Sequence, residues 1–134
     1  MGVTDFLEGH IGSHIFRTAS YPKPTELYVG FFLDTPDDLG DLTNEVSGGG
    51  YARPRLDPGD ENWGGPTEAD GTFFNLKNIE LPQQTTDWGT LTSWAIFDEG
   101  ANMLLYGDLV APVDILLTTA KGIIPPGYLQ ITVS

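Results

Sequence analysis

The chain has 134 residues, of which 19 are acidic and 6 are basic, so its formal net charge is -13. That length fits one domain with a single core, and the charge disfavours nucleic-acid binding, which needs clustered Lys and Arg facing the phosphates. The sequence contains no cysteine, which excludes disulfide bonds, thiolate zinc sites and thiol catalysis.

The N-terminal region is predicted to form a short amphipathic helix. Apolar side chains recur there at helical spacing, at Val3, Phe6, Leu7, Ile11 and Ile15. Gly9 and Gly12 interrupt the stripe, and each costs up to ~1 kcal/mol relative to Ala in a helix interior. The helix therefore needs a surface on which to dock. We expect residues 1–26 to be a helix-and-linker arm and the apolar stripe to be a candidate assembly interface.

Two histidines, His10 and His14, fall in the same stripe four residues apart. Two imidazoles at this helical spacing could share a metal ion. A metalloprotease helix would carry Glu at position 11, where Ile11 stands instead. We therefore favour histidines that flank an apolar interface, and we expect no metal or other cofactor.

Eight later segments combine branched and aromatic residues with turn residues at their ends. They are residues 27–33, 51–56, 72–76, 78–81, 90–97, 103–109, 113–118 and 128–133. Pro54 removes a hydrogen-bond donor and makes 51–56 an edge or bulged strand. Eight short strands with no helical pattern after residue 17 predict an all-β fold, a single antiparallel β-sandwich over 27–134 that resembles a jelly roll.

The hairpin formed by residues 90–97 and 103–109 is expected to lie at the centre of this fold. Strict alternation places Trp94 and Ile96 on one face of the first arm, and Leu91 and Phe97 on the other. Neither face is consistently polar, so both must be covered. This pattern is typical of central strands in two packed sheets.

The loops at 34–50 and 57–71 hold most of the acidic residues. The twelve residues from Asp34 to Glu45 have the length of a helix-loop-helix calcium loop, but Pro36 and the late Gly40 do not fit that motif. An irregular calcium site formed by Asp34, Asp37, Asp38 and Asp41 is the alternative to carboxylates that are simply solvated. No nucleophile elbow or phosphate loop is present, so we expect a protein that is not an enzyme.

Trp63 is the best candidate for an exposed contact residue. It lies between Asn62 and Gly64 in a loop, and an exposed aromatic ring can stack on a sugar. Trp88 and Trp94 are expected to be core residues instead.

Four strings in chain order carry a family resemblance. They are residues 27–32 with Thr35-Pro36, then Glu-Val-Ser-Gly-Gly-Gly-Tyr-Ala-Arg at 45–53, then 87–90 leading to 96–98, and finally Leu-Leu-Tyr-Gly at 104–107. Together they resemble a family of small tailed-bacteriophage virion proteins, described as tail-fibre-like or as capsid cement proteins. The loop at 57–70 is more acidic and richer in proline than this family pattern.

The resemblance implies a non-enzymatic structural protein of the virion, made in the host cytoplasm and having no membrane partner. Its form as a capsid cement, or decoration, protein would be a homotrimer on the capsid surface that binds the major capsid protein. The alternatives are a tail-fibre or tail-associated structural protein, and a carbohydrate-binding module of a fibre that uses Trp63.

Overall fold

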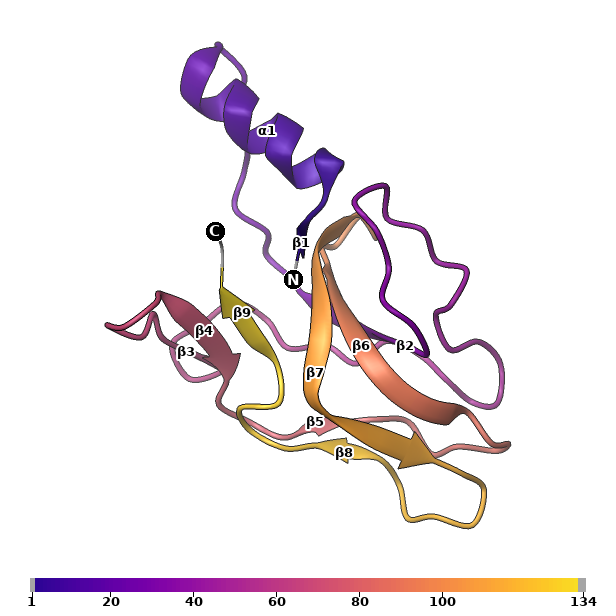
Figure 1. Cartoon of the computed structure of the whole chain (residues 1–134). Coiled ribbons are helices and arrows are strands. Elements are labelled where there is room, and N and C mark those ends of the chain that lie inside the picture. The colour runs from indigo at the N-terminus through magenta and orange to yellow at the C-terminus, as the bar shows by residue number, and fades with distance from the viewer. Residues whose placement is uncertain (1, 133–134) are drawn as a thin grey trace.

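The computed structural model describes residues 2–132 and consists mostly of strands, with one helix that projects from them (Figure 1). The elements are β1 Gly2–Val3, α1 Asp5–Phe16, β2 Tyr28–Phe32, β3 Trp63–Gly64, β4 Thr72–Asn75, β5 Ile79–Glu80, β6 Gly89–Phe97, β7 Met103–Ile115, β8 Ile123–Ile124 and β9 Gln130–Thr132.

The strands pair into three antiparallel sheets within the described residues. A four-stranded sheet has the order β1-β7-β6-β2, a three-stranded sheet has the order β3-β4-β9, and β5 pairs with β8. The all-β, antiparallel prediction is confirmed. The eight-stranded jelly roll is not confirmed, because the strands are divided into sheets of four, three and two.

The central hairpin is confirmed, and its second arm is longer than predicted. β6 pairs with β7 from Phe97↔Met103 to Gly89↔Ile115. The predicted strands at 103–109 and 113–118 are therefore wrong as separate elements, because β7 runs through Pro112 as one strand of 13 residues. Proline is tolerated there because the ladder is interrupted between Ser93↔Asp108 and Leu91↔Val113, where no hydrogen bond from residue 112 is required.

This interruption also changes which side chains share a face. Leu91 packs in the same buried cluster as Trp94 and Ile96, not with Phe97 as strict alternation predicts. An irregular register inserts unpaired residues and inverts the alternation beyond that point. Phe97 lies in a second buried cluster with Phe32, Ala95 and Met103.

The main core joins all three sheets. Its members include Phe31 from β2, Trp94 from β6, Ile124 from β8 and Ile131 from β9. The second cluster covers the other face of the four-stranded sheet near the hairpin turn. Further along β7 that face is open, since Asp108, Val110 and Asp114 are exposed. The expectation that both faces of the hairpin are covered is therefore met only at its turn end.

The other predicted strands are shorter in the structure than predicted. Residues 51–56 contribute only one isolated bridge, Arg55 to Tyr28, along the edge of β2. Strands β1, β3 and β8 are not predicted from the sequence, because two-residue strands are too short to show alternation.

Candidate assembly surface

The base of the N-terminal arm is fastened to the hairpin. Val3 lies in β1 opposite Leu105, so its placement in the helix stripe is wrong. Thr4 follows as the helix N-cap: its hydroxyl donates to the Met103 carbonyl at 2.6 Å and accepts from the Leu7 amide at 3.4 Å. Leu7 is the one buried side chain of α1. The arm is thus anchored at its first turn.

Beyond that turn, the returning linker lies against α1. The Tyr21 amide donates to His14 Nδ1 at 3.1 Å, and the His10 and Tyr21 ring centroids are 5.4 Å apart. His10 Nδ1 donates to the Phe6 carbonyl at 2.8 Å. The two histidines thus engage different local partners, and within residues 2–132 no cluster of three or more His, Cys, Asp or Glu could hold a metal ion.

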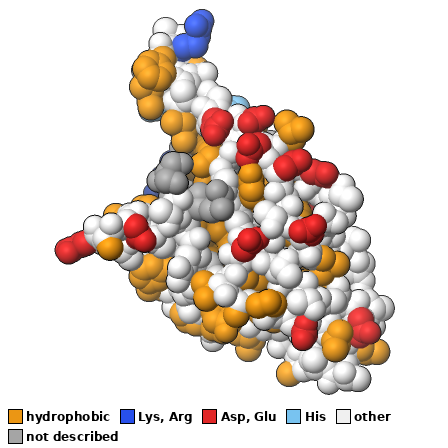
Figure 2. Space-filling model, viewed as in Figure 1, with side chains coloured by type: hydrophobic (Ala, Val, Ile, Leu, Met, Phe, Trp, Pro, Cys, Tyr) orange, Lys and Arg blue, Asp and Glu red, His pale blue; other side chains and the backbone are white. Residues whose placement is uncertain are grey.

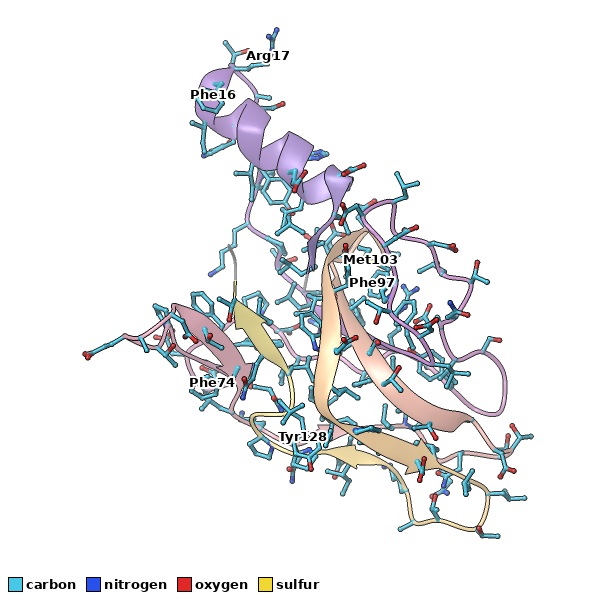
Figure 3. The ribbon with its side chains drawn as sticks, in the orientation of Figure 1. Phe16, Arg17, Phe74, Phe97, Met103 and Tyr128 are labelled. Carbon is cyan, nitrogen blue, oxygen red and sulfur yellow. The ribbon has the colours of Figure 1, made fainter. Side chains whose placement is uncertain are left out.

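The far end of the arm, residues 9–17, projects away from the sheets; we call it the arm tip. Ile15 is 64% exposed and Phe16 is 84% exposed, and Ile11 is exposed as well. Figure 3 shows Phe16 and Arg17 at the outermost turn of α1. Of the predicted interface residues, Leu7 is therefore buried and Phe6 partly buried at the base, whereas Ile11 and Ile15 lie on the free tip. Phe16 was missed, although it ends the same helix.

An apolar hollow lies beside the base of the arm, with a volume of about 290 Å³. Its lining comes from the arm, the linker, the 57–62 loop and four strands, and includes Leu7, Leu27, Pro58, Trp63, Leu105 and Ile131. Trp63 is therefore not on an exposed loop: it lies in β3, is half-buried, and donates its indole N–H to the Leu56 carbonyl at 3.2 Å. Glycan binding by Trp63 stays a prediction.

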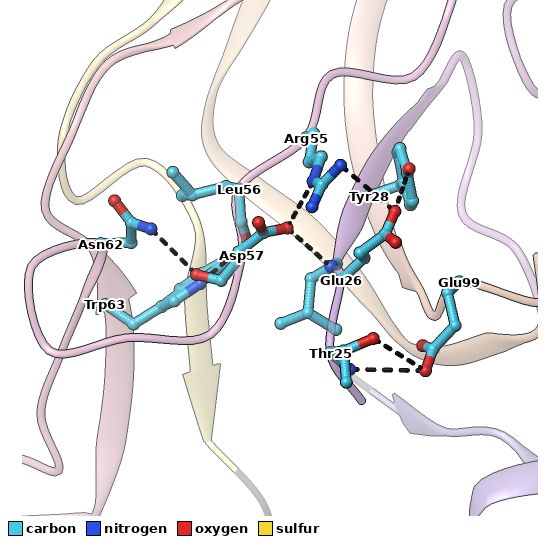
Figure 4. A network of polar contacts seen from close by, with 10 residues as sticks. Thr25, Glu26, Tyr28, Arg55, Leu56, Asp57, Asn62, Trp63 and Glu99 are labelled. Carbon is cyan, nitrogen blue, oxygen red and sulfur yellow. Dashed lines mark hydrogen bonds and ion pairs between the residues drawn. The ribbon is translucent and has the colours of Figure 1, made fainter. Parts of the chain in front are cut away.

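A polar network holds the linker against the loop that precedes Trp63 (Figure 4). Arg55 pairs with Asp57 at 2.7 Å and with Glu26 at 3.3 Å, and the Tyr28 hydroxyl donates to Glu26 at 2.6 Å. The Arg55 guanidinium keeps the pKa of Asp57 below its usual value. The network thus joins the linker to the loop beside the hollow, and among the described residues the linker is what the arm tip contacts.

Comparison with known proteins identifies the family. The model of the family described as Podophage GP4 fiber I protein gp80 matches residues 2–132. The chain belongs to this family. The resemblance to tailed-phage virion proteins is thereby confirmed, and the description names a fibre protein. No protein with a curated description matches the chain.

The string at 45–53 that resembles this family proves to be a structural clasp. Glu45 accepts two bonds from Arg53, both of 2.8 Å, and one from the Tyr51 hydroxyl at 2.9 Å. Burial, and then the Glu45 charge, raise the pKa of Tyr51. The Arg53 guanidinium also lies 3.6 Å from the centre of the Phe97 ring. The clasp therefore ties this loop to the second buried cluster.

The glycines inside the string allow a close approach to the body. Gly49 and Gly50 both have positive φ, and the Gly49 carbonyl accepts the Trp88 indole N–H at 2.8 Å. A Cβ at Gly50 would lie 2.7 Å from the Gln83 carbonyl oxygen. Only glycine meets both requirements without strain.

The acidic loop at 34–41 uses its carboxylates in local bonds. Asp37 accepts from the Leu39 and Asp41 amides, and Asp38 accepts from the Tyr106 hydroxyl. This bond raises the pKa of Tyr106 to about 12. The Thr43 hydroxyl lowers the pKa of Asp41. The proposed calcium ligands thus point at protein donors.

We expect a chelator to leave the thermal midpoint unchanged, because the carboxylates of this loop already have protein donors. A calcium ion bound at a hundred times its dissociation constant would add ~2.7 kcal/mol to stability. Thermal melts with and without EDTA check this prediction. A fall of several degrees on chelation, reversed by added calcium, would contradict it and make Asp34 and Asp41 the first residues to replace.

No helix within residues 2–132 has the length and apolar content required to cross a bilayer.

Proposed function

We propose that this protein is a non-enzymatic structural subunit of the phage virion that assembles as a homotrimer through its N-terminal arm, in or beside the tail fibres. The observation that carries the proposal is the arm itself. A domain with a buried core that joins its three sheets nevertheless holds Ile15 and Phe16 in solvent at the end of a helix. Ile11, Ile15 and Phe16 are all exposed on this one helix end, and contiguous exposed apolar groups are typical of interaction sites.

The family description favours the tail fibre as the location. The capsid cement function is the second candidate, with the major capsid protein as partner. It is favoured by the form of the body, in which three short sheets close around one core instead of repeating along a shaft. A subunit of that form suits a surface clamp as well as a fibre base.

The non-enzymatic part of the proposal is supported by how the polar side chains are used. Glu45 and Arg53 bind one another, Arg55 binds Asp57 and Glu26, and the Gln84 amide donates to backbone carbonyls such as that of Leu116. Each of these groups holds one segment of the chain against another. Contacts of this kind serve to stabilise loops, which agrees with a structural role.

Gold-labelled antibody against the protein, imaged on purified particles by electron microscopy, tests the location. We expect label at the tail. Label spread over the capsid would instead support the cement function. Particles that contain none of the protein, by label and by mass spectrometry, would contradict both forms of the proposal.

A further inference from the structure

We propose that the arm tip of one copy docks into the apolar hollow of a second copy of this chain, so that Phe16 enters beside Trp63 and Pro58. This inference rests on the proposed self-association and specifies the surfaces that carry it. Each copy offers one tip and one hollow, so the contact runs head to tail and closes into a ring when the rotation permits.

The described residues of the chain leave the apolar side chains of the tip uncovered. Phe16 and Ile15 are the outermost apolar residues of α1, and the described residues that touch the arm do so at its base and along the returning linker. Gly9 and Gly12 weaken the helix, and a Cβ at either position would meet nothing within 4 Å. A helix that is weak and unpacked gains most from a partner surface.

The hollow accepts an aromatic ring. Its volume of about 290 Å³ is roughly twice that of an apolar protein cavity that binds benzene. The side chains that line it are nearly all apolar, and the arm contributes Leu7, at the base of α1, to the lining. Burial of a large apolar side chain there stabilises the contact through the hydrophobic effect.

The tip cannot fill the hollow of its own chain. Phe16 lies nine residues beyond Leu7 on one continuous helix, which places it roughly 13 Å further along the axis. Because Leu7 itself borders the hollow, the tip could return only if the helix broke. A tip that fills this hollow therefore belongs to another molecule.

Charge favours a second copy as that molecule. The arm tip carries Arg17 and no carboxylate, whereas 17 of the 19 acidic residues and only five of the six basic residues follow it in the chain. Figure 2 shows the basic end of the projecting arm and the acidic side chains spread over the body. Asp60 and Glu61, both exposed, follow the rim residue Pro58 by two and three positions and outnumber Lys23, the basic residue of the described lining. Complementary charge of this kind steers the tip to the body of a sister copy and orients it there.

Disulfide trapping tests the contact directly, because the natural chain has no cysteine. A Phe16→Cys variant is mixed with a size-tagged Pro58→Cys variant and oxidised. We expect a mixed disulfide several-fold more abundant than with a size-tagged Leu117→Cys control, whose side chain is exposed in the turn that follows β7. Lys23→Cys, also on the rim and exposed, replaces Pro58→Cys if that variant melts at a lower temperature.

Each result is decisive. A mixed disulfide specific to the rim supports the docking. Wild-type protein that sediments as a trimer but gives no disulfide above the Leu117→Cys control overturns the docking and leaves self-association standing. Wild-type protein that sediments as a monomer at every concentration overturns both the docking and the self-association. That result is also the one expected if the tip binds a different virion protein.

Discussion

Replacing Trp94 with Ala is expected to lower the free energy of unfolding by about 3–5 kcal/mol. Trp94 is completely buried, lies opposite Phe31 and Gly107 in the central sheet, and belongs to the cluster that joins the three sheets. Its indole N–H donates to the Asp108 carbonyl at 3.1 Å, so the truncation removes both packing and a buried hydrogen bond. Denaturant titration followed by circular dichroism measures the loss.

Val110→Ala is the control for this experiment, because Val110 lies on the adjacent strand β7 and is mostly exposed. Surface substitutions of this kind change stability by about 0.5 kcal/mol or less. If Trp94→Ala costs below about 1 kcal/mol, Trp94 cannot be the centre of a shared core.

The second large effect is expected for Glu45→Ala. Removing one partner of a fully buried ion pair costs about 3–5 kcal/mol, because the other charge is left without compensation. The Glu45–Arg53 pair is only partly buried, so we expect a loss of about 1.5–3 kcal/mol, the range for hydrogen bonds to charged groups. The Arg53 and Glu45 side chains are only 21% and 10% exposed, and Glu45 also accepts from the Tyr51 hydroxyl. The variant therefore releases the loop at 45–53 from the edge of β2, and the same denaturant titration reports its lower stability.

Glu68→Ala provides the matched control, since Glu68 is an exposed loop residue with the same side chain. A second variant, Glu45→Gln, removes the charge but keeps an acceptor for Tyr51, and is expected to fall between the control and Glu45→Ala. Equal stability of Glu45→Ala and Glu68→Ala would show that the clasp contributes nothing to the fold.

The central hairpin was predictable because its signals are local. Thr, aromatic and branched residues fill β6 and the start of β7, and the connection holds Gly100. The face of Leu91 was not predictable, because it depends on the irregular pairing between β6 and β7. Alternation along one strand carries no information about an interruption set by its partner.

The candidate site was predictable only in part, because local patterns carry no information about tertiary contacts. Helical spacing identified the arm. Which stripe residues are free depends on how the base docks: Leu7 is buried at the hairpin, whereas Ile15 and Phe16 lie beyond the sheets. The clasp of Glu45, Tyr51 and Arg53 was visible as a string, but its buried bonds arise from tertiary packing.

Sedimentation velocity of the wild-type protein and two single variants tests most directly whether the arm carries self-association. Phe16→Glu places a charge on the arm tip, and Leu39→Glu places the same charge on an acidic-loop residue that is 83% exposed, against 84% for Phe16. We predict that the wild type and Leu39→Glu sediment as trimers and that Phe16→Glu sediments as a monomer with an unchanged melting temperature. A Phe16→Glu variant that sediments together with the wild type would contradict the account.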